Sequence, residues 1–431
     1  MGADYLEAIF RPRSIALIGA SKTPGKLGYE ILTNIVKYGF SGPIFPINPK
    51  YNEIHDIRCY KSILDVVDEV DLAILTGPID KIPKLIGELG AQGVKVAVVI
   101  SGMRGDPSSK EIYKAIKRHG IRLVGPSSLG VMYAKGELNA TLGPVEVLDG
   151  NVALITESST LGVALMGLAS IEGVGLSAVI GLGDKLDIDE TDVLQFFEED
   201  MSTKAILIYM ESIRDKEKFL RVAKRISKSK PIVLIGPRHG VIEELSLEKA
   251  GILPARDIQQ ALDWAKALST GVKAGGKRVL IVTNSGGAGK MAYGLAKGTE
   301  IDLVKPSEEL KEELSQFVPE KGRYENPVDL TGRAEIDAYR GVLEVALSSD
   351  EVDGVIAIYC ESVLSDPSRI VDIIYRLKGT YNKPTLVSVI GGARALEALR
   401  KLREKGIPAY PTPHRAINSM EALIKWSLFS K

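Results

Sequence analysis

The chain has 431 residues, of which 45% are hydrophobic and 26% charged, and its 55 Lys and Arg residues are balanced by 55 Asp and Glu residues. This length predicts about three domains of roughly 100–200 residues each, and the balanced charge favours a small phosphorylated ligand over nucleic acid or an anionic membrane. Because the two cysteines, Cys59 and Cys360, lie far apart and neither a signal sequence nor ~18 consecutive apolar residues occur, we expect a cytoplasmic protein without disulfides, structural metal or membrane contact.

Apolar, β-branched runs alternate with amphipathic stretches along the whole chain, which is the pattern of parallel strands joined by helical crossovers. The sequence therefore predicts an α/β protein throughout. In the first third, the predicted strands are Ser14–Ile18, Ile44–Ile47, Leu72–Thr76, Val94–Ile100 and Arg122–Val124. Each ends close to Gly, Pro or Ser, which is typical of the ligand-binding carboxyl edge of a parallel sheet.

Two further units follow the same scheme. The second has predicted strands at Asn151–Ile155, Leu176–Ile180, Ala205–Tyr209 and Pro231–Ile235 and a helix near Asp257–Leu268. After a linker at Ser269–Lys277, the third has predicted strands at Arg278–Val282, Gly354–Tyr359 and Thr385–Val389. We expect domains at residues 1–148, 149–270 and 276–431. In the second and third domains the first strand is followed by a similar turn, at Thr156–Gly162 and at Asn284–Gly289. These turns indicate two related flavodoxin-like folds. Alternatively, the two domains are unrelated, because such turns are common.

The first strand runs into a glycine-rich turn and a helix start. The glycines would let the backbone approach a pyrophosphate, whose charge a helix N-terminus favours. An NAD site would place an Asp or Glu about 20 residues further on, but here the second strand ends in Asn48-Pro49-Lys50. Lys50 suits the ribose 3′-phosphate of coenzyme A (CoA), unless it is only a solvated turn residue. The predicted CoA-binding residues are Gly19, Ser21, Gly25, Lys26, Gly28, Asn48, Pro49 and Lys50.

Motifs spread over nearly the whole chain resemble those of the nucleoside-diphosphate-forming acyl-CoA synthetases, a family that includes archaeal ADP-forming acetyl-CoA synthetases and is related to succinyl-CoA synthetase. The matching segments are residues 18–21 with 24–28, 46–50, 125–130, 182–190, 284–289 and 326–332. The resemblance implies a Rossmann-like CoA-binding domain followed by two flavodoxin-like domains. It also implies a hetero-oligomer with an ATP-grasp subunit, through which nucleotide and Mg would bind.

The family converts acyl-CoA and phosphate to an acyl phosphate, then to a phosphohistidine that phosphorylates the nucleoside diphosphate. The resemblance assigns Glu211, after the strand Ala205–Tyr209, to the carboxylate that holds the phosphohistidine. Two strand–turn–helix segments are expected to bind phosphate through free backbone N–H groups. Their predicted phosphate-binding residues are Ser158, Ser159, Thr160, Ser285, Gly286 and Gly287.

Three departures from the family pattern bear on this interpretation. Glu157 stands where the family usually has Gln, and an anion there would repel phosphate unless it is protonated or turned away. Ser127-Ser128 replaces an Asn-Cys pair in the turn expected to contact the thioester. The family's Ser-His-Thr-Gly-Ser stretch after the strand Pro231–Ile235 is missing, so the phosphohistidine loop is interpreted as deleted.

Four histidines occur, His55, His119, His239 and His414, and none lies in that motif. His239 is near the expected position and is a candidate carrier, although no stretch rich in Ser, Thr and Gly surrounds it as a phosphate cradle. Three hypotheses follow: a synthetase subunit with a rearranged carrier, on His239 or on a partner; a regulatory or partly active CoA-binding paralogue; and, least favoured, a nucleotide-dependent oxidoreductase.

Overall fold

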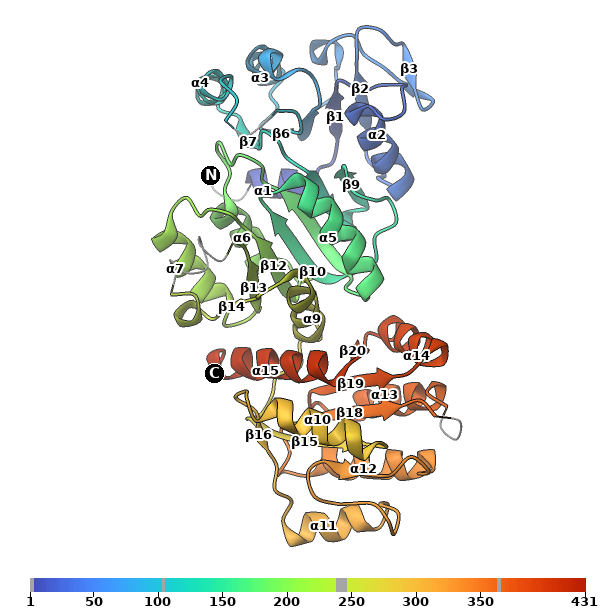
Figure 1. The fold of residues 1–431 in the computed structure, drawn as a ribbon. Helices are drawn as coiled ribbons and strands as arrows, with labels where there is room; N and C mark the ends of the chain where they lie inside the picture. The colour runs from blue at the N-terminus through green and yellow to red at the C-terminus, as the bar shows by residue number, and fades with distance from the viewer. Residues whose placement is uncertain (1–3, 103–104, 238–245, 363–365) are drawn as a thin grey trace. The chain divides into compact units, whose positions relative to one another are not determined.

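The computed structural model describes residues 4–102, 105–237, 246–362 and 366–431 (Figure 1). The described chain divides into two units. One comprises Met1–Ile226 with Ile232–Pro254, and the other comprises Ser227–Pro231 with Ala255–Lys431. The first unit contains two domains and the second contains one, and each domain has its own sheet.

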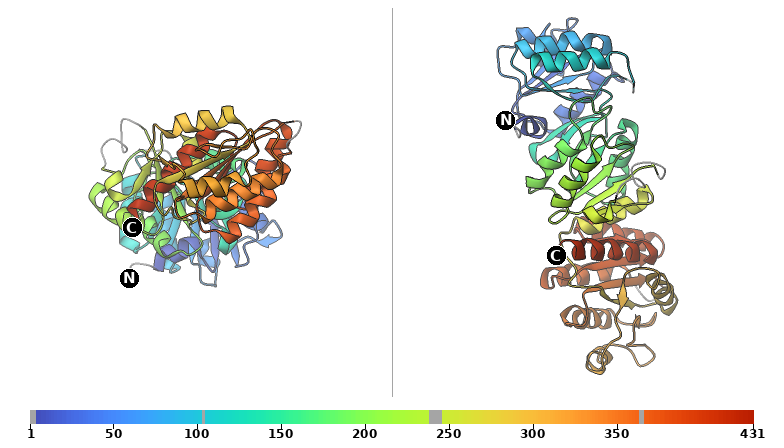
Figure 2. Two further views of the ribbon diagram at one scale, coloured as in Figure 1. Left: turned by 90° about the horizontal axis from the view of Figure 1, so that it is seen from below. Right: turned by 90° about the vertical axis from the view of Figure 1, so that its left-hand side faces the viewer.

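The first domain has a five-stranded parallel sheet in the order β2-β1-β5-β6-β7. Its elements are α1 (Asp4–Phe10), β1 (Ile15–Ile18), α2 (Leu27–Tyr38), β2 (Ile44–Ile47), the hairpin β3 (Glu53–Ile54) and β4 (Ile57–Arg58), β5 (Leu72–Leu75), α3 (Ile82–Ala91), β6 (Val96–Val99), α4 (Ser109–His119) and β7 (Arg122–Val124). Helices α3 and α4 lie side by side over one face (Figure 2). Every residue of β1 is buried because helices cover both faces of the sheet.

The second domain has a seven-stranded sheet in the order β14-β13-β12-β10-β11-β8-β9, in which β8 and β9 run antiparallel to their neighbours. Its elements are β8 (Gly130–Tyr133), β9 (Leu138–Thr141), β10 (Asp149–Thr156), α5 (Ser159–Glu172), β11 (Leu176–Gly181), α6 (Glu190–Glu199), β12 (Ala205–Tyr209), α7 (Lys216–Ile226), β13 (Ile232–Ile235) and β14 (Ile252–Pro254). Helix α5 covers one face of this sheet, and α6 and α7 cover the other (Figure 1).

A continuous apolar core joins the first two domains. It contains Ile15 and Leu17 of β1, and it also contains Phe10, which stacks on Phe196 of α6 with ring centroids 4.2 Å apart. Tyr133 of β8 packs edge-on against both rings. The first domain is therefore held against the second by close packing and not by a linker alone.

The third domain has a parallel sheet in the order β16-β15-β18-β19-β20, with β17 also paired to β15. Its elements are α9 (Ile258–Leu268), β15 (Arg278–Thr283), α10 (Gly286–Ala296), β16 (Asp302–Leu303), α11 (Glu308–Ser315), β17 (Val328–Asp329), α12 (Ile336–Ser348), β18 (Gly354–Cys360), α13 (Ser368–Thr380), β19 (Thr385–Ile390), α14 (Ala393–Glu404), β20 (Ala409–Tyr410) and α15 (Pro413–Phe429).

The predicted fold class, an α/β protein with a Rossmann-like domain and two flavodoxin-like domains, is confirmed, and every predicted strand is present with ends shifted by at most two residues. Two arrangements were not foreseen. The β8–β9 hairpin precedes residue 149 but belongs to the second sheet. Helix α9 precedes residue 270 but packs in the second unit, where the Asp263 carboxylate accepts two hydrogen bonds, of 2.6 and 2.7 Å, from Arg415.

Within the residues that the structure describes, no helix is both long and apolar enough to cross a lipid bilayer.

Candidate functional site

The turn between β1 and α2 brings two stretches of backbone unusually close together. A Cβ atom added to Gly28 would lie 2.1 Å from the carbonyl oxygen of Gly19, so only glycine permits this approach. Gly19 itself has a φ of +94°, which glycine adopts without strain, and its N–H donates to the Ile47 carbonyl at 3.0 Å. The turn thus packs the start of α2 tightly against the ends of β1 and β2.

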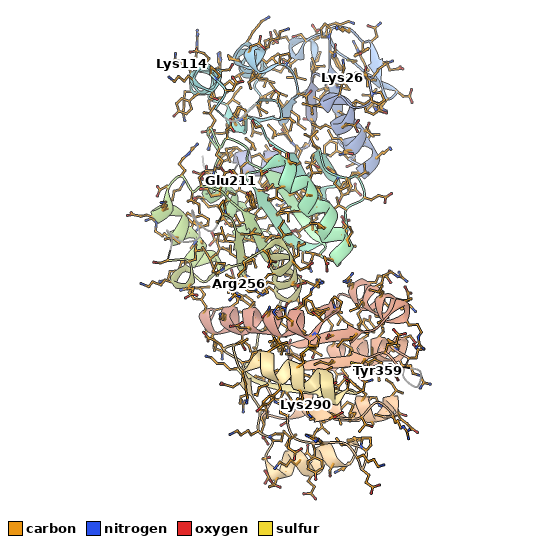
Figure 3. The ribbon with its side chains drawn as sticks, viewed as in Figure 1. Lys26, Lys114, Glu211, Arg256, Lys290 and Tyr359 are labelled. Atoms are coloured by element: carbon orange, nitrogen blue, oxygen red, sulfur yellow. The ribbon has the colours of Figure 1, made fainter. Side chains whose placement is uncertain are left out.

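The N-terminus of α2 is exposed, although the Glu30 carboxylate in its first turn accepts a hydrogen bond from the Gly25 N–H at 2.7 Å. Lys26 is its N-cap residue, and no side chain accepts a hydrogen bond from the first-turn N–H groups at that cap. Residues 22–27 are exposed, whereas Ser21 is buried and its hydroxyl accepts a hydrogen bond from the Thr23 N–H. Figure 3 labels Lys26 at this turn. Uncapped N–H groups, the helix dipole and an exposed lysine suit a pyrophosphate, so the residues present fit CoA.

The end of β2 borders the same turn. Asn48 donates from its side-chain amide to the Ala20 carbonyl at 2.7 Å and accepts from the Lys50 N–H at 3.0 Å. Pro49 is exposed, and its carbonyl accepts a hydrogen bond from Lys61 at 3.1 Å. The exposed Lys50 ammonium makes no hydrogen bond or ion pair with any residue that the structure describes. The structure therefore brings the predicted CoA-binding residues together at one sheet edge and leaves this cation available.

Replacing Lys50 by Ala is expected to weaken CoA binding about five-fold, the size of one exposed charge-assisted contact. Dephospho-CoA, which lacks the 3′-phosphate, should bind wild type and variant equally. Calorimetry with CoA, dephospho-CoA and NAD measures this, with Lys37→Ala at the far end of α2 as the matched control. Equal binding of CoA and dephospho-CoA by the wild type would remove the role of Lys50, and preference for NAD would remove the CoA site itself.

The turn at residues 125–130 connects the first sheet to the second. The Ser128 hydroxyl donates to the Gly181 carbonyl at 2.5 Å and accepts from the Gly130 N–H, so this hydroxyl holds the turn. Ser127 has a φ of +58°, an uncommon conformation for serine. Its carbonyl accepts a hydrogen bond from the Ser159 hydroxyl at 2.5 Å, in the first turn of α5. The turn expected to contact the thioester therefore touches the predicted phosphate turn.

The N-terminus of α5 forms that phosphate turn. Ser158 is the N-cap residue, and its hydroxyl accepts from the Leu161 N–H at 3.3 Å. Ser159 and Thr160 begin the helix, and Thr160 is exposed. One side-chain cap satisfies one of the four N–H groups that a helix start leaves free, so this terminus retains donors for an anion.

Glu157 is turned away from α5 and into the protein. Its carboxylate pairs with the Lys185 ammonium at 3.0 Å and accepts from the N–H groups of Glu211 and Ser212 at 3.0 and 3.1 Å. Burial by itself raises the pKa of Glu157, but attraction to Lys185 and these hydrogen bonds outweigh it and hold that pKa below its usual value. The expected repulsion of phosphate is therefore relieved by orientation and by a paired cation.

Lys185 also pairs with a second carboxylate. Its ammonium lies 3.3 Å from Glu190, whose side chain is fully buried at the start of α6. Burial raises the pKa of Glu190 against the opposing attraction of Lys185. The Lys185 ammonium donates a further hydrogen bond to the Ser212 carbonyl at 2.7 Å. Sequence reasoning had given no role to Lys185, Glu190 or Ser212, although the first two lie in the family motif at residues 182–190.

Glu211 follows β12 at the carboxyl edge of the second sheet, where Figure 3 labels it. Its side chain accepts a hydrogen bond from the Tyr209 hydroxyl at 3.2 Å, and its N–H is bound by Glu157. The side chain is partly exposed. The other candidate for the phosphoryl step, His239, lies outside the described residues.

The third domain presents the second predicted phosphate turn. Ser285 caps α10 and accepts from the Ala288 N–H at 3.4 Å, and Gly286 and Gly287 begin the helix. A carboxylate lies close by, because a Cβ atom on Gly286 would be 2.5 Å from an Asp329 oxygen. Asp329 is the last residue of another strand, β17, and follows Asn284 by 45 residues in the sequence, so only the fold brings it here.

Three domain families match the chain in order. They are the CoA binding domain over residues 13–134, the succinyl-CoA ligase like flavodoxin domain over residues 149–244 and the Ligase-CoA domain over residues 279–430.

Relatives cover the chain from end to end. Subunit alpha of the ADP-forming acetate–CoA ligase I of Pyrococcus furiosus is 41% identical over 98% of both chains. The alignment runs over 455 positions against 431 residues here, so at least 24 residues of that relative have no counterpart in this chain. The ADP-forming acetate–CoA ligase of Methanocaldococcus jannaschii is 36% identical over 99% of this chain, which covers 64% of that longer protein.

A solved structure has the same fold. The dinucleotide forming acetyl-coenzyme A synthetase 1 of Candidatus Korarchaeum cryptofilum, in complex with phosphate and ADP, superposes with a TM-score of 0.94 and 37% identity. The match covers 99% of this chain and 98% of that one.

Proposed function

The chain belongs to the ADP-forming acyl-CoA synthetase family, and we propose that it is the CoA-binding, alpha-type subunit of such an enzyme. One observation carries the proposal. The Ser159–Ser127 hydrogen bond joins the α5 phosphate turn to the turn at the edge of the CoA-binding domain. A thioester bound by the first domain would thus meet a phosphate bound by the second.

The reaction assigned to this chain is the transfer of an acyl group from CoA to phosphate. A phosphate oxygen attacks the thioester carbonyl carbon, the C–S bond breaks, and CoA leaves as the thiolate while an acyl phosphate forms. The free N–H groups at the start of α5 hold and orient the phosphate. The glycine turn at Gly19 and Gly28, with Lys50, holds CoA.

The nucleotide step is assigned to an ATP-grasp partner subunit, which would bind ADP and Mg. Two observations support a partner. The chain corresponds over its whole length to a subunit alpha, and the longer Methanocaldococcus relative extends well beyond the part that matches. We also propose that the partner supplies the phosphoryl carrier, since the chain lacks the Ser-His-Thr-Gly-Ser stretch and is at least 24 residues short against its Pyrococcus relative.

A second candidate is a CoA-binding paralogue that performs no nucleotide chemistry. The missing histidine motif favours it. The oxidoreductase hypothesis has no support from the matched families, all three of which are named for CoA binding or CoA ligases.

The purified chain should release CoA from acetyl-CoA when arsenate is added, without nucleotide or partner. Arsenate has the charge and shape of phosphate, and its acyl ester hydrolyses at once, so thiol release becomes irreversible and a thiol reagent can follow it. Dependence on arsenate separates transfer from simple hydrolysis. A chain that binds CoA but releases none under these conditions would support a regulatory paralogue without acyl-transfer activity instead.

A further inference from the structure

We propose that Glu157 is a positioning residue, which sets Glu211 in place for the phosphoryl carrier through the backbone that follows β12. This inference rests on the proposed function, because it concerns the step that delivers phosphate to ADP. Glu157 itself contacts neither CoA nor phosphate in this assignment.

Glu157 both donates a hydrogen bond to the segment at the end of β12 and accepts hydrogen bonds from it. Its backbone N–H donates to the Tyr209 carbonyl at 3.0 Å, which extends the pairing of β10 with β12 by one residue. Its carboxylate then turns back and accepts from the next two N–H groups, those of Glu211 and Ser212. The Ser212 hydroxyl donates to the other carboxylate oxygen at 3.1 Å. Four hydrogen bonds from one residue thus fix the segment that carries Glu211.

Burial gives these contacts their strength. Glu157 is 7% exposed and Lys185 is 5% exposed, so water competes little for either group. Lys185 ties the same segment from the other side through the Ser212 carbonyl. Charge-assisted hydrogen bonds away from water are stronger than neutral ones. The segment is therefore held by a buried ion pair on one side and by the sheet on the other.

The position of the Glu211 carboxylate depends on the backbone segment that carries it. This side chain is partly exposed, and its carboxylate accepts a hydrogen bond from the Tyr209 hydroxyl at 3.2 Å. A shift of its Cα atom moves the carboxylate by a similar amount, and a misplacement of about 1 Å costs on the order of a hundred-fold in rate. Where this backbone sits therefore decides whether the carboxylate meets the carrier's imidazole.

A glutamine at position 157 would keep the geometry and lose the charge. Its amide oxygen can accept from the N–H groups of Glu211 and Ser212, and its amide nitrogen can donate to the Ser212 hydroxyl. An alanine keeps neither acceptor. The pair Glu157→Gln and Glu157→Ala therefore separates the positioning role from the charge.

The test compares two activities of one complex, formed by co-expressing the chain with the ATP-grasp subunit from the same organism. ATP formation from acetyl-CoA, ADP and phosphate needs Glu211, whereas arsenate-driven CoA release does not. Glu157→Ala should lower ATP formation at least about ten-fold more than it lowers CoA release. Glu157→Gln should keep ATP formation within about three-fold of wild type. Glu198→Gln, at an exposed pair with Arg225 in the same domain, should leave both activities unchanged.

The double variant Glu157→Ala/Glu211→Ala should be no slower than Glu211→Ala alone, because a residue that acts through another adds nothing once the other is gone. Additive losses, or equal losses of both activities in Glu157→Ala, would overturn the inference and leave the proposed function standing. A wild-type complex that releases CoA but makes no ATP would instead remove the proposed nucleotide step, and the inference with it.

Discussion

Glu211→Ala is expected to lower ATP formation by the reconstituted complex by about two orders of magnitude, the usual contribution of a positioned acid–base group. The carboxylate fixes the tautomer of the carrier's imidazole and raises its nucleophilicity. His239→Ala should leave ATP formation unchanged, because residues 236–250 lack the Ser- and Gly-rich neighbours of a phosphate-carrying loop. We therefore expect a large loss of ATP formation in Glu211→Ala and no loss in His239→Ala.

Labelling locates the carrier directly. With radioactive acetyl phosphate, an acid-labile and base-stable label should appear on the ATP-grasp subunit and not on this chain. Stoichiometric label at His239, lost in His239→Ala, would show that the chain keeps its own carrier on the shortened segment. No label on either subunit would favour the paralogue that performs no nucleotide chemistry.

Lys185→Met is expected to destabilise the first unit by about 3–5 kcal/mol at pH 7, which is the cost of leaving buried carboxylates without their cation. The Lys185 ammonium lies 3.0 Å from a carboxylate oxygen of Glu157 and 3.3 Å from one of Glu190, and all three side chains are buried. The midpoint of guanidinium-induced unfolding measures the loss. Lys84→Met, at an exposed helix pair with Glu88, is the matched control and should change stability by less than about 0.5 kcal/mol.

The deficit of Lys185→Met should shrink as the pH falls from 7 to 5. In the wild type the pKa of Glu157 is below its usual value, so its ionised form contributes stability above the unfolded pKa and this contribution is lost as the pH falls through the folded pKa. In the variant, burial raises the pKa of Glu157 and further raises that of Glu190, so acid protonates and relieves both. A deficit that stays constant over this range would show that lost packing, not charge, dominates.

The sequence alone determined the central parallel strands of each domain, the turns that follow them and the class of ligand. Parallel strands covered on both faces must be apolar over their whole length, so β1, β5 and β6 are visible as short buried runs that end close to Gly or Ser. The glycines of the first turn and Asn48-Pro49-Lys50 are local signals too, because backbone approach and a missing acidic residue can be recognised within one segment. The family resemblance added the order of the three domains and the expected role of Glu211.

Only the tertiary structure decided which side chains of the site contact one another. Whether Glu157 repels phosphate depends on Lys185, 28 residues away, and on Glu211 and Ser212, more than 50 residues away. These groups meet because the carboxyl ends of β10, β11 and β12 share one edge. The approach of Asp329 to α10, the β8–β9 hairpin and the pairing of Asp263 with Arg415 have the same origin. A side chain's direction and its partner's charge are set by contacts distant in sequence, and no local pattern of residue types encodes them.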